Sequence, residues 1–405
     1  MDQQQAVEQV VEQVVEQPVD ALFSAYFPLP YRAVSTFIIG VWAWAITLQY
    51  LTKLHIDVES LLRFNQQRSG PPLYRSVYEV AGILTIVYAI SATFFWMASN
   101  GSAYLAFLGL DILALSCFVA VPAIFFYPGI AFHRPGRYRF LRTMRRIMFG
   151  GLDRDTRFAD TLVADALTSY TKVIGDMWVM TCMVLSHKSV ASIPDRTCGG
   201  KFVVPTIIAI PYLIRLRQCL TDYLRSGARE NTHLLNAVKY TTTFPVIILS
   251  AVQRSHSESD NGSFLGALTL YNLWVLCMVV NSLYSFYWDV TKDWDLTMFK
   301  ISSKNANLPH KGLRSILYFP SPYIYYAAVF VDFILRFTWS LKVSPHLYFF
   351  NEQEGGVFAL EMMELLRRWI WLFLRIETEW IRTTGSGRLP AAMSEAGTGL
   401  HEAKD

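Results

Sequence analysis

Charged side chains are scarce in this sequence. Asp, Glu, Lys and Arg make up 17% of the 405 residues, whereas hydrophobic residues make up 53% and aromatic residues 15%. A soluble domain contains roughly 25% charged residues, so this composition argues against an ordinary water-soluble core. The formal net charge of +4 is small, and clustered basic residues are better explained by membrane orientation than by nucleic acid. We therefore expect an integral membrane protein with no nucleic-acid partner.

Cysteine motifs and catalytic motifs are also missing. The five cysteines form no C-x-x-C pair, and four lie in apolar segments, so we expect neither a zinc site nor a disulfide framework. The sequence has no G-x-x-x-x-G-K-[ST], H-E-x-x-H or G-x-S-x-G, which argues against nucleotide, zinc-protease and serine-hydrolase sites. Asp289 and Asp293 would permit a metal-dependent membrane transferase, but a salt bridge to Lys292 is the simpler interpretation. We predict no enzyme activity, no catalytic residues, no cofactor and no metal.

The sequence begins without a signal-peptide pattern. Its first 20 residues are polar and repeat a V-E-Q unit, with no basic start followed by an apolar stretch. We expect residues 1–30 to form a polar cytosolic tail. Residues 383–405 are rich in Gly, Ala and Ser and are expected to form a flexible C-terminal tail.

Long apolar runs dominate what is present. A helix needs roughly 20 apolar residues to span hydrocarbon. The five clearest runs are residues 33–51, 77–98, 102–127, 264–288 and 323–341. Four weaker runs, interrupted by charges, are residues 160–185, 202–220, 234–252 and 357–380. The sequence therefore predicts an all-α, polytopic membrane helix bundle of about ten transmembrane helices.

Residues 138–152 decide whether the total is nine or ten. The segment has an apolar face, but its arginines make crossing costly without protein partners. The basic stretch contains Arg134, Arg137, Arg139, Arg142, Arg145 and Arg146. Its positive charge favours the cytosol, whereas ten spans with both termini cytosolic would start it on the other side, so both arrangements stay open. We divide the chain into N-terminal transmembrane helices over 31–155 and a transport bundle over 156–382.

Ionisable residues in and beside the apolar runs of the second half are the main clue to function. Each charge at mid-membrane depth costs roughly 2.5 to 3.5 kcal/mol, so deep charges must face one another or a water-filled cavity. The set is Asp160, Asp165, Lys172, Asp176, Arg215, Arg217, Lys239, Asp289, Asp293, Asp332, Arg336, Glu361, Glu364, Arg367, Arg368 and Arg375. It holds eight cations and eight acids, so structural salt bridges explain it as well as a ligand site does.

Helical spacing narrows these alternatives. Residues four apart share a helix face. The pairs at this spacing are Asp332 with Arg336, Glu364 with Arg368, and Asp289 with Asp293. Arg367 and Arg368 point about 100° apart, so only one of them can use Glu364. The other needs a different anion, and a guanidinium offers parallel donors to phosphate, sulfate or a carboxylate.

Six motifs are similar to those of a known family. They are IPYLIRLRQCL (210–220), HLLNAVKYTTTF (233–244), NSLYSFYWDVTKDWDL (281–296), FADTLVADALTS (158–169), DFILRFTW (332–339) and ELLRRWIW (364–371). Together they resemble the EXS domain family over about residues 30–382.

The resemblance implies an all-helical bundle of about ten spans, often dimeric, whose last six helices enclose a phosphate pathway. The implied phosphate-contacting positions are Asp165, Arg229, Lys239, Tyr240, Asp289, Asp293, Arg336, Trp339, Arg367 and Arg368. By the same resemblance, the cations hold the anion and the aspartates orient those cations and limit their grip. Trp339 is expected to act as a steric gate.

The resemblance also implies a function. The family contains plasma-membrane phosphate exporters with a cytosolic SPX domain, and short fungal Golgi proteins named for defective retention of endoplasmic-reticulum residents. Only about 30 residues precede the first apolar run, so the similarity is to the short form. The implied role is a Golgi membrane phosphate transporter or channel that returns phosphate released by lumenal glycosylation to the cytosol, supporting glycosylation and glycosyltransferase retention.

Other roles and locations remain open at this stage. One is a sorting protein that binds glycosyltransferase tails or coat machinery; another is a plasma-membrane phosphate exporter. The endoplasmic reticulum is an alternative location. The expected partners of the transporter are inorganic phosphate and membrane lipid. A homodimer is one of the assemblies that the sequence leaves open. Asn261-Gly262-Ser263 is a glycosylation sequon.

Overall fold

The computed structural model describes residues 18–63, 72–100, 110–150, 157–227, 229–257, 264–299, 310–342 and 353–384. Within these ranges the regular elements are all helical. In the N-terminal part they are α2 (Pro18–Tyr26), α3 (Leu29–Lys53), α4 (Val58–Leu61), α5 (Leu73–Ser99), α7 (Asp111–Phe126) and α8 (Arg134–Phe149). They continue with α9 (Arg157–Ser169), α10 (Thr171–Leu185), α11 (Val203–Arg225), α12 (Asn231–Thr241), α13 (Thr243–Ser257) and α14 (Phe264–Trp288). The last are the π-helix η1 (Asp289–Asp293), α15 (Pro322–Arg336), the 3-10 helix η3 (Thr338–Lys342) and α17 (Glu354–Thr384).

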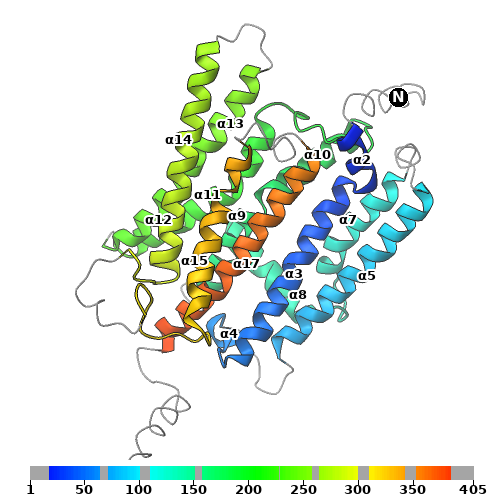
Figure 1. Cartoon of the computed structure of the whole chain (residues 1–405). Helices are drawn as coiled ribbons and strands as arrows, with labels where there is room; N and C mark the ends of the chain where they lie inside the picture. The colour runs from blue at the N-terminus through cyan, green and yellow to red at the C-terminus, as the bar shows by residue number, and fades with distance from the viewer. Residues whose placement is uncertain are drawn as a thin grey trace, which may run out of the picture.

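The helices form two groups with α17 between them (Figure 1). In the first group α3, α5 and α7 pack against one another. In the second, α11 packs on α12, and α13 packs on α14. The long helix α17 contacts α3 of the first group and α15 and α9 of the second. A side chain on α17 therefore reaches residues from both halves of the sequence.

Apolar exposure and polar burial are the reverse of a soluble protein. On the outer faces of α5 and α7, Ile86 is 61% exposed, and Met97 and Ile112 are each 72% exposed. Inside, Asp289 is 0% exposed and Asp332 is 2% exposed. An apolar surface around a charged interior suits hydrocarbon, where polar groups must be satisfied within the protein.

The predicted all-helical membrane bundle is confirmed, but the count of about ten spans is not. Six stretches of described helix are long and apolar enough to cross a membrane. They are Leu29–Lys53, Leu73–Ser99, Val203–Arg225, Asn231–Gln253, Thr269–Asp293 and Pro322–Leu341. Asp111–Phe126 is apolar but shorter. The predicted runs at 160–185 and 357–380 are helical, but the first is divided between α9 and α10, and the second carries too many charges to qualify by composition.

Two of the predicted runs are broken, and a third helix changes its winding directly after the predicted run 264–288. The first run divides at Tyr170, between α9 and α10. The second divides at Thr242, whose hydroxyl donates to the Lys239 carbonyl (2.8 Å). In the third, α14 widens into η1, with the Trp294 amide donating to the Asp289 carbonyl (2.9 Å). Broken membrane helices are tolerated where protein or a water-filled cavity satisfies the freed backbone groups.

A close approach of α3 fixes the first break. Tyr170 lies against Gly40 of α3, and its hydroxyl donates to the Thr36 carbonyl (3.3 Å). A Cβ atom at Gly40 would lie 1.8 Å from that hydroxyl. Glycine at position 40 therefore lets α3 approach the α9–α10 break.

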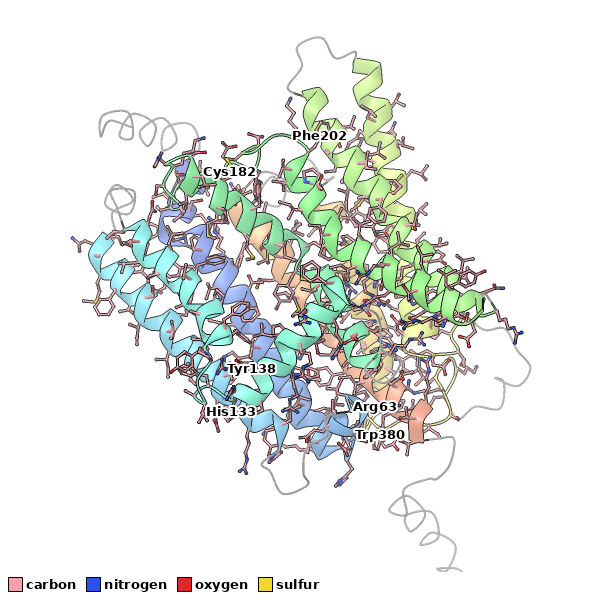
Figure 2. The ribbon with its side chains drawn as sticks, turned by 180° about the vertical axis from the view of Figure 1, so that it is seen from behind. Arg63, His133, Tyr138, Cys182, Phe202 and Trp380 are labelled. Atoms are coloured by element: carbon pink, nitrogen blue, oxygen red, sulfur yellow. A yellow bond between two sulfur atoms is a disulfide. The ribbon has the colours of Figure 1, made fainter. Side chains whose placement is uncertain are left out.

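The basic helix α8 lies at one end of the bundle, packed against α7 and α9. Arg137 donates to carbonyls at the end of α7, including those of Ile124 (2.8 Å) and Tyr127 (2.7 Å). Arg146 pairs with Asp160 at the start of α9 (2.5 Å). Figure 2 shows Tyr138 and His133 at the end that also holds Arg63 and Trp380. Arg137 and Arg146 thus have protein partners, and α8 is not one of the six apolar helices.

A disulfide at the opposite end corrects the prediction that no cysteines pair. Cys182 at the end of α10 is bonded to Cys198 in the loop 186–202 (Figure 2), with Cα atoms 6.0 Å apart. The apolar surroundings of Cys182 suggested a buried thiol, but the loop folds back over the helix end. Cys117, Cys219 and Cys277 are free.

Candidate functional site

A lysine between two aspartates forms the centre of the buried charge cluster. Lys239 lies at the end of α12, beside the break at Thr242, and its Nζ is 2.9 Å from Asp289 Oδ1. The same Nζ is 3.7 Å from Asp293 Oδ2. Both aspartates belong to η1, and the Trp371 indole donates to Asp293 (3.2 Å). The sequence suggested Lys292 as the salt-bridge partner of this aspartate pair, whereas the structure places Lys239 beside both carboxylates.

Two arginines share the carboxylates on the other side of Asp289. Arg336 of α15 pairs with Asp289 and with Asp332 (3.2 Å), its predicted neighbour four residues earlier. Arg367 of α17 lies 3.5 Å from Asp289 and 3.3 Å from Asp332. Its guanidinium also donates twice to Glu364 (2.6 and 2.9 Å). Asp289 thus contacts three cations, and the tightly paired arginines have fixed positions.

Arg368 is held differently from the other cations of this cluster. Its Nε donates to the Ser169 hydroxyl (2.9 Å) and its Nη2 to the Thr168 hydroxyl (3.1 Å). Its guanidinium lies over the Trp371 ring, 4.6 Å from the ring centroid. Within the described part of the chain, Arg368 forms no ion pair with a carboxylate.

This arrangement answers the question that the adjacent arginines raised. The sequence indicated that only one of them can use Glu364, and the structure confirms it. However, the arginine bound to Glu364 is Arg367, three residues on, and not Arg368, four residues on. Ser169 connects the two, because it accepts from Arg368 and donates to Glu364 (2.7 Å). Arg368 is consequently the cation of this cluster whose guanidinium is available to bind an anion.

Asp165 and Tyr240 form the neighbouring part of the cluster. The Tyr240 hydroxyl donates to Asp165 (2.7 Å), and Arg215 of α11 pairs with the same carboxylate (2.6 Å). The Arg215 guanidinium lies 5.0 Å from the Tyr240 ring centroid. All three side chains are buried. Sequence reasoning had placed Arg215 among the intramembrane charges but had not assigned it to the site.

Trp339 and Arg229 lie outside the centre of the buried charge cluster. In η3, the Trp339 indole donates to the Ser282 hydroxyl (3.0 Å), and its ring contacts Trp274 edge-on at 6.3 Å. The Ser282 hydroxyl in turn donates to the backbone carbonyl of Arg336 (3.4 Å). Arg229 is exposed in the loop between α11 and α12, outside the buried cluster. Its predicted contact with phosphate stays a prediction.

The sequence missed Thr168 and Ser169 as site residues. They are the last two residues of α9, and their hydroxyls accept hydrogen bonds from Arg368. The signal was present in the motif FADTLVADALTS, which ends on these two residues. Nothing in its apolar periodicity, however, indicates that the helix ends there.

A second charge cluster lies beside the disulfide loop. Arg196 of this loop pairs with Asp176 of α10 and with Glu354 at the start of α17 (3.0 Å). Nearby, Lys188 donates to Asp195 (2.9 Å). Although partial burial opposes ionisation, hydrogen bonds from Lys188 and Thr197 and the charge of Lys188 hold the pKa of Asp195 below its ordinary value.

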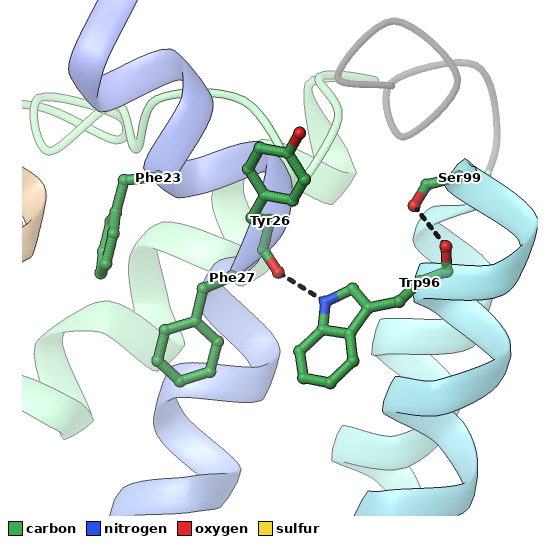
Figure 3. A pocket seen from close by; sticks show the side chains of 5 residues that line it. All are labelled: Phe23, Tyr26, Phe27, Trp96 and Ser99. Atoms are coloured by element: carbon green, nitrogen blue, oxygen red, sulfur yellow. Dashed lines mark hydrogen bonds between the residues drawn. The ribbon is translucent and has the colours of Figure 1, made fainter. Parts of the chain in front are cut away.

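An apolar hollow also lies at this end, away from the central charges. It has a volume of about 420 Å³ and is lined by Phe23, Tyr26, Phe27, Trp96 and Ser99 (Figure 3). The Trp96 indole donates to the Tyr26 carbonyl (2.8 Å). The lining offers no charged side chain to an anion. Among the described residues, no group of three or more His, Cys, Asp and Glu side chains is arranged to hold a metal ion.

Comparison with known proteins identifies the family. The EXS family profile matches residues 27–381. The chain belongs to the EXS family. It is similar to "Protein ERD1 homolog 2" of Schizosaccharomyces pombe, with 30% identity over 86% of this chain and 95% of that protein. It is 32% identical to "Protein ERD1" of Kluyveromyces lactis over 56% of this chain and 60% of that protein.

A solute carrier is a further relative of this EXS chain. "Solute carrier family 53 member 1" of Mus pahari is 28% identical over 80% of this chain, but the match covers 46% of that longer protein. The family profile over residues 27–381 includes the helices that carry the buried charge cluster. This EXS protein is thus a multi-pass, helical membrane protein related to both groups.

Proposed function

We propose that this EXS chain carries inorganic phosphate across a membrane through the cluster around Arg368. The supporting observation is the incomplete pairing of Arg368, whose donors rest on two neutral hydroxyls in a buried, charged interior. A guanidinium binds a tetrahedral oxyanion with two parallel hydrogen bonds. Arg367 and Lys239, already held by carboxylates, would add positive charge without closing around the anion.

The carboxylates make that binding weak enough for release. Asp289 and Asp332 occupy donors of Arg336 and Arg367, so an arriving anion competes with them. Permeation needs several moderate contacts, because an anion held too firmly does not leave. Trp339 at the margin would restrict the passage sterically, as the family resemblance implies.

The two ends of the bundle differ in a way that fits a membrane of the secretory pathway. Disulfides persist in oxidising compartments, and positive residues favour the cytosolic side. The disulfide Cys182–Cys198 lies at one end, and the arginine-rich α8 at the other (Figure 2). We infer that the α8 end faces the cytosol and the disulfide end faces the lumen. This would put α2 on the lumenal side, opposite to the cytosolic location expected for residues 1–30.

The proposed physiological role is return of phosphate from the Golgi lumen to the cytosol. Glycosylation from nucleotide sugars leaves nucleoside diphosphates, whose hydrolysis releases phosphate in the lumen. Similarity to the ERD1 proteins motivates the Golgi assignment. The sequon at Asn261, which lies outside the described residues, provides a test of orientation: endoglycosidase sensitivity is expected, and persistent insensitivity of an otherwise glycosylation-competent chain would contradict it.

The transport proposal is tested by reconstitution. Purified protein in liposomes should give saturable phosphate flux above that of protein-free liposomes, reduced by excess unlabelled phosphate. Sulfate, added as competitor, measures how strongly the site selects phosphate. Correctly inserted, folded protein without flux would refute transport and would favour the sorting role.

A further inference from the structure

One face of α17 carries charges from the disulfide end to the central site. Glu354, Glu361 and Arg368 are seven residues apart, which is almost two helical turns and about 10 Å per step. Glu354 belongs to the cluster at the disulfide loop, and Arg368 to the central cluster. Lys172 lies in the first turn of α10, three residues after Ser169, which binds Arg368. Asp176 follows Lys172 by about one helical turn. Glu361 and Lys172 therefore lie between the two clusters on both helices.

Unlike most charged residues of the two clusters, Glu361 and Lys172 form no ion pair with each other or with a third residue among the described residues. Glu361 is 6% exposed, and its Oε1 is buried without a hydrogen-bond partner. Lys172 has no ion pair with a carboxylate within the described part of the chain. The two residues nevertheless interact electrostatically, and Glu361 is the acid with the largest effect on Lys172. An ionised carboxylate whose oxygen is buried without a hydrogen-bond partner is unfavourable, so this position requires a proton or a ligand.

The surrounding charges show what the position can accept. Asp176 of α10 has the largest electrostatic effect on Glu361, followed by Lys172, by Arg196 of the disulfide loop and by Arg32 of α3. On α17 itself, Glu364 is the further acid that acts on Lys172. Arg196 and Arg32 are already bound to Glu354. Lys172 is consequently the cation with free donors between Arg196 and Arg368.

We propose that Lys172 and Glu361 form a second oxyanion subsite, on the disulfide side of Arg368, which binds its anion together with a proton on Glu361. The proposal deepens the transport function and rests on it. While Glu361 is ionised, it repels the anion and competes for Lys172. Once protonated, it repels no longer and offers an O–H donor to an anion oxygen. The proton enters with the anion from the aqueous phase at the disulfide end and is released when the anion leaves.

The experiment is phosphate flux in proteoliposomes as a function of pH at the disulfide side. Wild-type flux should rise as that pH falls from about 9.5 to about 6.5, because protonation of one carboxyl changes up to tenfold per pH unit. Glu361→Gln, which resembles the protonated acid, should keep the flux seen at low pH and vary less than about twofold over this range. Phosphate's own titration is common to both proteins, so the ratio of their fluxes isolates Glu361.

Lys172 is tested by charge removal and restoration. Lys172→Gln should raise the KM for phosphate about tenfold or more, as expected for a lost charge-assisted hydrogen bond, and Lys172→Arg should recover most of it. Thr181→Val is the matched control on α10, because that exposed hydroxyl bonds only its own helix at the Met177 carbonyl. Melting temperatures in detergent identify any variant that fails to fold.

The outcomes separate this subsite from the transport proposal. A wild type without phosphate flux would refute the transport function itself. Flux that depends on Arg368 but retains the wild-type pH profile in Glu361→Gln would overturn the subsite alone. An unchanged KM in folded Lys172→Gln would do the same.

Discussion

Replacing Arg368 with glutamine should weaken the affinity of transport for phosphate strongly, while the protein still folds. Arg368 donates to two hydroxyls and stacks on a ring, and no carboxylate depends on it for an ion pair. Losing hydrogen bonds to neutral partners costs about 1 to 3 kcal/mol of stability in total. Losing a charge-assisted hydrogen bond to phosphate costs about 1.5 to 3 kcal/mol, which corresponds to roughly a 10- to 150-fold rise in the concentration for half-maximal flux.

The assay is saturable uptake of labelled phosphate into proteoliposomes, with thermal melting of the same preparations. Lys188→Gln is the matched control, since it removes a cation whose pair with Asp195 lies at the surface, with side chains 40% and 31% exposed. The control should transport as wild type does. A folded Arg368→Gln protein with wild-type affinity and flux would refute the reasoning.

Three further predictions concern stability. Arg367→Gln should lower the free energy of unfolding by about 3 to 5 kcal/mol, because its carboxylate partners lose a buried cation; a melting temperature equal to that of wild type would contradict this. Gly40→Val should cost about 1 to 3 kcal/mol or more by overpacking against Tyr170, whereas a Cβ at Gly82 meets nothing within 4 Å, so Gly82→Ala should melt as wild type does. Cys198→Ser should reduce stability by about 3 kcal/mol by opening a loop closed over a separation of 16 residues, and mass spectrometry of alkylated protein should show Cys182 free only in this variant.

Local spacing predicted one charge pair correctly and another wrongly, since Glu364 binds Arg367 and not Arg368. Asp332 and Arg336 form the expected pair, because residues four apart meet on a helix. The conflict between Arg367 and Arg368 was also visible, since adjacent residues diverge by about 100°. The sequence could not show which arginine binds Glu364, because that depends on the rotation of α17 against α9 and on the hydroxyl of Ser169.

The breaks in the helices could not be predicted from apolar periodicity. The runs at 160–185 and 234–252 continue across Tyr170 and Thr242 without a proline or glycine at the break itself. Tertiary contacts determine them: Tyr170 packs against Gly40, and Thr242 bonds Asn281 (2.9 Å). The disulfide was missed for a related reason, since it depends on a polar loop returning over the end of α10.

The most direct test of the account is to locate phosphate in an experimental density map of the protein in lipid nanodiscs, with and without phosphate. We predict a tetrahedral density within about 3 Å of the Arg368 guanidinium, present only with phosphate. Density at another site, with Arg368 still bound to Thr168 and Ser169 at saturating phosphate, would contradict the central claim.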